Sequence, residues 1–222
     1  MGIGAAGLPF LGGSTDSVPA PSSHGVVFFT PHPDDETLAG GPLLATLGFA
    51  PLVVAMTGGG ASAARAKTGL SESDFIAARL REQAAAVTAL GGAVDQTCPL
   101  RDGKVTCDDA YAVMLPYVQQ NPGAVFATTS PNDLHPDHHA CGQALRRLTN
   151  DYRIKALWCY SMASAVPARP EIVVHDGTHK TSLALAEYMH LDPKAGRYAI
   201  GARSVLSQIK AQEGALVSRC HL

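Results

Sequence analysis

Two short polar clusters carry residue types that are suited to metal chemistry. The first is His-Pro-Asp-Asp-Glu at residues 32–36, and the second is His-Pro-Asp-His-His at residues 135–139. Each follows a short apolar run, at residues 26–29 and 124–127, that is typical of a buried strand. Histidine and carboxylate side chains bind catalytic zinc through three protein ligands and leave a fourth position for water. The clusters therefore predict a metal site assembled from distant parts of the chain.

The spacing of the residues identifies two of the three candidate metal ligands but not the third. His32 and Asp35 are separated by two residues across a proline-stiffened turn, so both side chains can bend toward one point. A third ligand has to come from the second cluster, where His135, His138 and His139 lie within about one helical turn. Spacing alone does not select among these three histidines.

Asp34 is the surplus carboxylate beside this ligand pair. It is placed to accept a proton from a metal-activated water that attacks a carbonyl carbon. Asp137 can orient a neighbouring histidine, and a histidine not used as a ligand can stabilise the developing negative charge. These roles indicate metal-assisted hydrolysis of an amide or ester. The competing interpretation is a helix-capping aspartate in the first cluster and solvated histidines in the second.

The same motifs resemble those of the LmbE/PIG-L family of zinc-dependent de-N-acetylases. The family's His-Pro-Asp-Asp-Glu motif is matched at residues 32–36, and its His-Pro-Asp-His motif at residues 135–138. The resemblance implies a Rossmann-like fold and one zinc ion per chain, and ferrous iron suits the same two-histidine, one-carboxylate set. The roles it implies are metal ligation by His32, Asp35 and His138, general base catalysis by Asp34, and oxyanion stabilisation or amine protonation by His135 accompanied by Asp137.

Weaker similarity extends over residues 25–150 and includes the Arg/Glu-bearing sequence at residues 79–82. Residues 57–60 depart from the family, because they read Thr-Gly-Gly-Gly where Thr-x-Gly-Glu is usual, which removes an acid that contacts substrate. The chain is also short for the family, which predicts a reduced C-terminal insertion. Three residues are candidates for substrate binding, with solvated or turn-forming roles as the alternative: Arg65, Asn132 and Asp133.

Apolar and amphipathic segments alternate along the chain. The predicted strands are residues 26–30, 52–57, 93–100, 124–129, 155–160 and 171–175. The predicted helices are residues 36–48, 71–90, 108–120, 136–149, 178–190 and 202–216. This order predicts one α/β, Rossmann-like three-layer domain over residues 24–222, with a mainly parallel sheet covered on both faces. Because ligands bind at the carboxyl ends of such strands, both clusters are expected on the same rim.

Composition excludes several classes of function. A formal charge of −2 without a Lys/Arg block argues against a nucleic-acid partner, and no apolar run approaches the roughly 20 residues of a membrane span. Residues 1–23 are predicted to be a flexible tail; localisation is cytoplasmic or exported, and the mildly apolar residues 5–11 favour export although no basic region precedes them. The five cysteines include no Cys-x-x-Cys pair, and Cys98 and Cys107, which flank a turn-like stretch, are candidates for a disulfide.

The leading functional hypothesis is a hydrolase that removes an N-acyl group, most simply acetyl, from an amino sugar or related small molecule with a glycosidic linkage. The alternative is a non-catalytic metal- or sugar-binding module on the same fold. A nucleotide-cofactor enzyme is disfavoured because residues 58–60 lack the Gly-x-Gly-x-x-Gly spacing. The sequence gives no indication of the oligomeric state.

Overall fold

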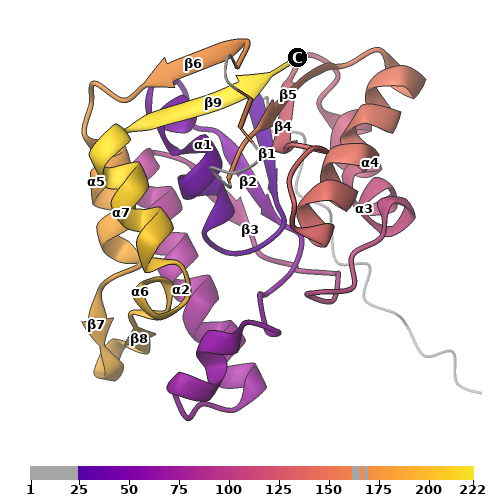
Figure 1. Cartoon of the computed structure of the whole chain (residues 1–222). Helices are drawn as coiled ribbons and strands as arrows, with labels where there is room; N and C mark the ends of the chain where they lie inside the picture. The colour runs from indigo at the N-terminus through magenta and orange to yellow at the C-terminus, as the bar shows by residue number, and fades with distance from the viewer. Residues whose placement is uncertain (1–24, 162–165, 168–169) are drawn as a thin grey trace, which may run out of the picture.

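A computed structural model of the chain describes residues 25–161, 166–167 and 170–222 (Figure 1). The tail predicted for residues 1–23 lies outside the described residues.

The main sheet has the strand order β3-β2-β1-β4-β5-β9-β6. Its strands are β1 Val26–Thr30, β2 Leu52–Ala55, β3 Ala93–Asp95, β4 Val125–Thr129, β5 Lys155–Cys159, β6 Ile172–His175 and β9 Val217–His221. Strands β1 to β5 pair in parallel, and β9 is antiparallel to β5 and β6, so the predicted mainly parallel sheet is confirmed.

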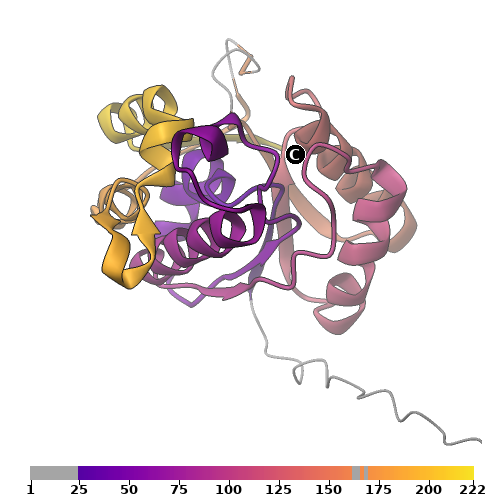
Figure 2. The same ribbon diagram turned by 90° about the horizontal axis from the view of Figure 1, so that it is seen from below.

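Helices cover both faces of this sheet, which confirms the predicted three layers (Figure 2). The helices are α1 Asp35–Ala45, α2 Glu72–Leu90, α3 Cys107–Gln120, α4 Pro136–Tyr152, α5 Lys180–Glu187, α6 Ile200–Ser204 and α7 Leu206–Ala215. Short 3₁₀ turns at Ala63–Lys67 and Pro193–Ala195 and a small hairpin, β7 Leu191–Asp192 with β8 Arg197–Tyr198, complete the fold. No helix among the described residues is long and apolar enough to cross a membrane.

Strand β1 shows why its sequence is apolar without interruption. Val26 and Phe28 point to the face that is covered by α1, α2, α5 and α7, where they join one buried cluster. Val27 and Phe29 point to the opposite face and pack with side chains from α3 and α4. A strand that is buried on both faces has no solvent-facing position for polar residues. The polar residues therefore begin only where β1 ends.

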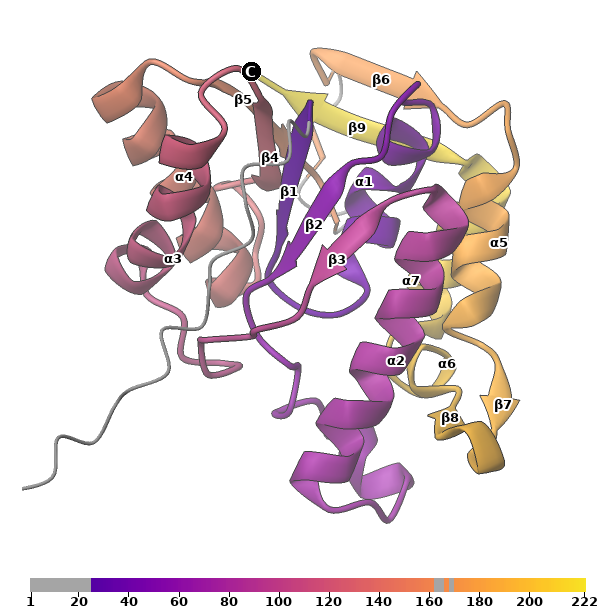
Figure 3. The same cartoon turned by 180° about the vertical axis from the view of Figure 1, so that it is seen from behind.

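The C-terminal third differs most from the prediction. The single helix predicted for residues 202–216 is two helices, α6 and α7, that meet at Val205. Strand β9 was not predicted, although it lies in the sheet between β5 and β6. Helices α5 and α7 pack on the same side of the sheet as α2, as Figure 3 shows from behind. This arrangement places α6 and α7 beside the carboxyl ends of the strands, where they contribute to the site.

Helix α3 corrects one detail of the prediction. The helix predicted for residues 108–120 begins with an aspartate, which would be its cap. The N-cap is instead Thr106, whose hydroxyl accepts a hydrogen bond from the Asp109 amide at 3.2 Å. Threonine and aspartate are both favoured at this position, so local propensity does not separate them.

Cys98 and Cys107, the candidate pair for a disulfide, are both free thiols. A disulfide instead joins Cys159 to Cys220, which are direct partners across the antiparallel pair of β5 and β9. Disulfides of this kind are usually found in proteins of oxidising compartments. The pairing could not be predicted because β9, which carries one of its cysteines, was not predicted.

We expect the Cys159→Ala/Cys220→Ala variant to lose about 4 kcal/mol of unfolding free energy, because the bridge closes a loop with a sequence separation of 61 residues. Urea unfolding of the variant beside the parent protein measures this loss. The Cys98→Ala variant, which alters a half-buried free thiol, is the control. Equal stability of the parent with and without reductant would contradict the expectation.

Candidate active site

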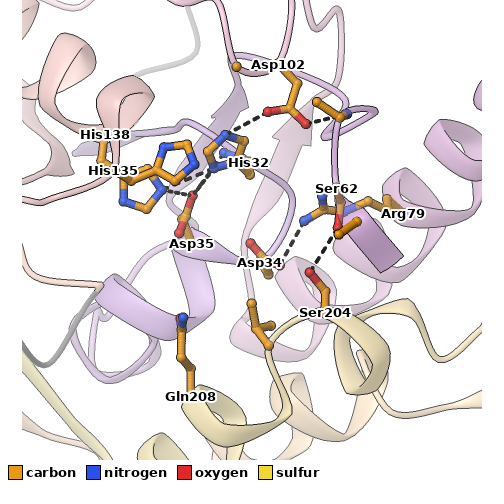
Figure 4. Close-up of a pocket in the computed structure, with 14 residues that line it drawn as sticks. His32, Asp34, Asp35, Ser62, Arg79, Asp102, His135, His138, Ser204 and Gln208 are labelled. Atoms are coloured by element: carbon orange, nitrogen blue, oxygen red, sulfur yellow. Dashed lines mark hydrogen bonds and ion pairs between the residues drawn. The ribbon is translucent and has the colours of Figure 1, made fainter. Parts of the chain in front are cut away.

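The ends of two neighbouring strands bring the two polar clusters together. Strands β1 and β4 pair in parallel, so the loops that follow them leave the same edge of the sheet. His32 Nδ1 lies 3.0 Å from Asp35 Oδ2 and 3.1 Å from His138 Nε2, and the latter two atoms are 3.0 Å apart (Figure 4). All three residues are buried. Three atoms about 3 Å apart can all lie about 2.1 Å from one ion, so this triangle fits a metal with three protein ligands.

Each imidazole of the triangle is held from behind by carboxylates. His32 Nε2 lies 3.1 Å from Asp102 Oδ1 and 3.1 Å from Asp137 Oδ2. His138 Nδ1 lies 3.2 Å from Asp133 Oδ2 and 2.9 Å from the Ser161 hydroxyl. Outer carboxylates of this kind fix the ring orientation of metal-binding histidines and increase their basicity. The triangle therefore has the supporting contacts of a ligand set.

The carboxylates of the site outnumber its cationic side chains. Four buried or half-buried carboxylates surround the triangle, which contains a fifth, and one buried guanidinium, Arg79, lies among them. Burial acts to lower the pKa of His138, but Asp35 and Asp133 more than offset it and raise that pKa to about 9. Burial acts to raise the pKa of Asp35, but His138 and His32 outweigh it and lower that pKa. Buried carboxylates that lie close together repel one another unless a positive charge lies between them. The donor set therefore fits a divalent cation.

Asp34 does not act as a side-chain helix cap, because its carboxylate makes no capping hydrogen bond to α1. Arg79 Nη2 donates to Asp34 Oδ2 at 2.8 Å and to the Pro33 carbonyl at 3.0 Å, and Arg79 Nη1 donates to the Gly59 carbonyl at 2.9 Å. Burial raises the pKa of Asp34 to about 7, although the Arg79 charge acts in the opposite direction. Oδ1 has no hydrogen-bond partner among the described residues, and Asp34 lines the cavity above the triangle. A free carboxylate oxygen at this place is suited to accepting a proton.

The same contacts explain the glycine at residue 59. Its φ is +67°, and a Cβ atom built there would overlap Nη1 of the Arg79 guanidinium. Only glycine adopts that backbone conformation without a steric cost. The Thr-Gly-Gly-Gly loop thus leaves room for the arginine that holds Asp34.

Replacing Arg79 by methionine is expected to lower the unfolding free energy by about 3–5 kcal/mol, because it leaves the buried Asp34 carboxylate without its partner. Chemical denaturation of Arg79→Met measures the loss. Arg81→Met, an exposed arginine on the same helix, is the matched control and should change stability by no more than about 0.5 kcal/mol. Equal effects of the two substitutions would show that the Arg79 contact does not stabilise the fold.

His135 lies directly beside the triangle. Its ring centroid is 4.7 Å from those of both His32 and His138. His135 is the N-cap of α4, and its Nδ1 accepts a hydrogen bond from the Asp137 amide at 3.2 Å. Burial and the two neighbouring histidines lower the pKa of His135. A neutral ring that accepts at Nδ1 carries its proton at Nε2, so His135 can serve as a hydrogen-bond donor in the cavity.

Asp137 supports a different residue from the one expected from the sequence. Its carboxylate contacts His32, and it also accepts hydrogen bonds from the amides of Gly103 at 2.7 Å and Val105 at 3.2 Å. Only its backbone amide contacts His135. Asp137 therefore connects the second cluster to the first and fixes the loop that carries Asp102.

Asp102 was not predicted as a site residue. Its loop returns to the sheet edge at Leu100, which bridges to Thr57, and this contact places Asp102 next to His32. We expect Asp102→Ala to weaken metal affinity about tenfold, because His32 loses one of two orienting carboxylates. Competition with a chromogenic chelator measures the affinity. An unchanged affinity would mean that Asp137 alone is sufficient to orient His32.

The three candidate substrate-binding residues lie in different surroundings. Asp133 is buried behind His138 and faces away from the cavity, so the structure places it as a supporting residue. Asn132 is exposed and does not line the cavity. Arg65 forms an ion pair with Glu72 at 2.5 Å and lines a second, adjoining cavity. None of the three therefore contacts the space above the triangle.

A cavity of about 470 Å³ opens above the triangle (Figure 4). The C-terminal helices form one wall through Ser204, Val205 and Gln208, which were not predicted as site residues. Ser204 Oγ lies 3.2 Å from Ser62 Oγ on the opposite wall. The carboxylate of Glu82 accepts hydrogen bonds from the amides at the start of α6 and so holds this wall in place. The Arg/Glu-bearing helix α2 thereby supports both the base candidate and the cavity wall.

Comparison with known families identifies the chain's relatives. A family model described as GlcNAc-PI de-N-acetylase (PIG-L) matches residues 27–149, which is more than half of the chain and includes both clusters. The chain belongs to the PIG-L family. No curated protein matches the sequence.

Solved structures similar to this PIG-L family member share its fold at low sequence identity. The A40926 pseudoaglycone deacetylase Dbv21 is 20% identical, with a TM-score of 0.62 over 84% of this chain and 85% of that chain. The N,N'-diacetylchitobiose deacetylase from Pyrococcus horikoshii is 18% identical, with a TM-score of 0.58 over 80% and 68%. GalB, a 4-carboxy-2-hydroxymuconate hydratase from Pseudomonas putida, is 14% identical, with a TM-score of 0.59 over 89% and 95%. The TM-scores show that the chain has the LmbE-like fold, which hosts more than one reaction.

Proposed function

We propose that this protein is a zinc-dependent N-deacetylase that hydrolyses the acetamide of an amino sugar or a related glycosidic small molecule. The observation that carries the proposal is the triangle of His32, Asp35 and His138 with the cavity-facing carboxylate of Asp34 beside it. Membership of the PIG-L family supports N-deacetylation, and two of the structural relatives are named deacetylases.

The proposed ligands of one metal ion per chain are His32 Nδ1, Asp35 Oδ2 and His138 Nε2. Bound there, zinc would polarise the amide carbonyl and lower the pKa of the attacking water toward about 7. Two imidazoles and one carboxylate suit ferrous iron as well, so elemental analysis has to identify the native metal. Asp102, Asp137 and Asp133 would hold the two ligand imidazoles in place.

The reaction assigned to the chain's own residues is general acid–base hydrolysis. Asp34 Oδ1 takes the proton of the water whose oxygen bonds to the carbonyl carbon. His135 Nε2–H donates a hydrogen bond to the oxygen on which negative charge develops. The proton that Asp34 has taken then passes to the departing nitrogen. The C–N bond breaks, and acetate and a free amine leave. Arg79 keeps Asp34 in position during these transfers.

The alternative is a metal- or sugar-binding module without turnover. Binding alone requires the triangle, but it gives no role to an unpartnered carboxylate oxygen of Asp34 or to a donor at His135. The arrangement of both around one cavity favours the enzyme.

Amine release from a panel of N-acetylated glucosamine conjugates tests the proposal. We expect turnover of at least one conjugate, with stoichiometric acetate. The same panel offered as N-propionyl and N-butyryl compounds defines the acyl preference. Saturable binding of a conjugate without release of amine would support the binding module and overturn the enzyme.

A further inference from the structure

A second cavity adjoins the one above the triangle. It has a volume of about 370 Å³ and shares three lining residues with the first: Ala61, Asp102 and Gly103. Its apolar part is formed by side chains such as Ile76 and Leu100. A conjugate whose acetamide lies above the triangle can therefore extend its distal part into this second cavity.

One tight turn forms the boundary between the two cavities. The Lys104 amide donates to the Arg101 carbonyl at 3.1 Å, and Gly103 adopts a φ of +75° within the turn. Asp102 points inward to His32, whereas Arg101 and Lys104 line the second cavity. The turn is fixed to Asp137 by the amide of Gly103. The positions of the two cationic residues are thus tied to the site itself.

The second cavity has a cationic character that the protein does not neutralise. Arg65, its third basic residue, is paired with Glu72. Asp102, its other acidic residue, is occupied by His32 and by the Ala61 amide at 2.7 Å. The side chains of Arg101 and Lys104 have no hydrogen-bond or ion-pair partner among the described residues. Two unpaired cations that line one cavity are suited to an anionic group, because charge-assisted hydrogen bonds to carboxylate or phosphate are strong.

We propose that Arg101 and Lys104 form a subsite for an anionic substituent, a phosphate or a carboxylate, on the part of the substrate distal to the acetamide. The inference rests on the proposed function, since the first cavity must hold the acylated amine. It narrows the substrate class from N-acetylated amino sugars in general to acidic conjugates of them.

Steady-state deacetylation of three matched substrates tests the subsite. These are methyl N-acetylglucosaminide, N-acetylglucosamine 1-phosphate and an N-acetylglucosaminide whose aglycone ends in a carboxylate. The variants are Arg101→Gln/Lys104→Gln and, as a control, Lys155→Gln, which removes an exposed charge at the start of β5. We expect the double variant to lose about tenfold in kcat/KM on at least one anionic substrate and less than about twofold on the neutral one. The control should leave all three values unchanged.

Binding of the same three compounds to the intact protein, measured by calorimetry, separates this inference from the proposed function. If none is turned over but an anionic one binds about tenfold more weakly to the double variant, the deacetylase proposal fails and the subsite stands. If turnover occurs and the double variant affects neutral and anionic compounds equally, the subsite is overturned and the deacetylase stands. Loss confined to the phosphate, or to the carboxylate, identifies which anion is bound. Equal binding of all compounds to parent and double variant also overturns the subsite.

Discussion

The Asp34→Asn variant is expected to deacetylate its substrate about 10²- to 10⁴-fold more slowly than the parent while it retains the bound metal. The amide of asparagine can still occupy the space beside Arg79, but it cannot accept a proton from water. Asp34 is not a corner of the triangle, so the three proposed ligand atoms are unaltered by the substitution. The expected signature is a large fall in kcat with unchanged metal content.

Single-turnover kinetics with metal analysis of the same samples measure this effect. The control is Asp108→Asn, an exposed carboxylate at the start of α3. Its kcat should equal that of the parent. Parental activity in Asp34→Asn would assign proton transfer to another residue, and joint loss of activity and metal would show that Asp34 acts through the metal site.

The second large effect is expected from His138→Ala, which should weaken metal binding by at least about 100-fold, more than loss of an outer carboxylate does. Removal of this imidazole leaves two of the three proposed ligands, His32 and Asp35, where a catalytic zinc site uses three. Activity should fall with metal occupancy. Titration with zinc, followed by amine release at each step, measures both quantities together.

His139→Ala is the matched control for this experiment. The adjacent histidine is exposed, and its Nδ1 lies against the Pro131 carbonyl and not against the triangle. We expect the His139→Ala variant to bind metal as the parent does. Sequence spacing alone did not distinguish His138 from His139 as the third ligand. Retention of metal by His138→Ala and loss by His139→Ala would assign that role to His139.

The sequence was informative where function depends on residues close together in the chain. His32, Asp34 and Asp35 lie within four positions, and the place of both clusters after predicted strands was enough to expect them on the same rim, as the parallel pair β1 and β4 now shows. Only the family resemblance singled out His138 among the three histidines of the second cluster. Asp102 could not be found in this way, because its place depends on where a loop returns to the sheet at Leu100. An isolated aspartate in a turn has no pattern that distinguishes it from a surface residue.

The fold of the C-terminal part could not be predicted either, because it also depends on contacts between distant segments. Strand β9 inserts between β5 and β6, and its pairing is set by tertiary contacts and a disulfide and not by local propensity. Without that strand, the bond between Cys159 and Cys220 could not be predicted. The cavity wall at Ser204 and Gln208 is formed by α6 and α7, which were predicted as one helix. Asp133 was predicted as a substrate residue for a related reason, since only the folded structure shows that it faces His138.

On the proposed mechanism, one divalent metal held by His32, Asp35 and His138 is required for N-deacetylation. The most direct test of this claim combines elemental analysis with amine release from N-acetylglucosamine conjugates on one preparation, before and after chelation and after metal is restored. We predict about one equivalent of zinc or iron per chain, loss of amine release on chelation, and recovery in proportion to the metal restored. Amine release that persists in metal-free protein, or metal-free protein that zinc and iron do not activate, would contradict the claim.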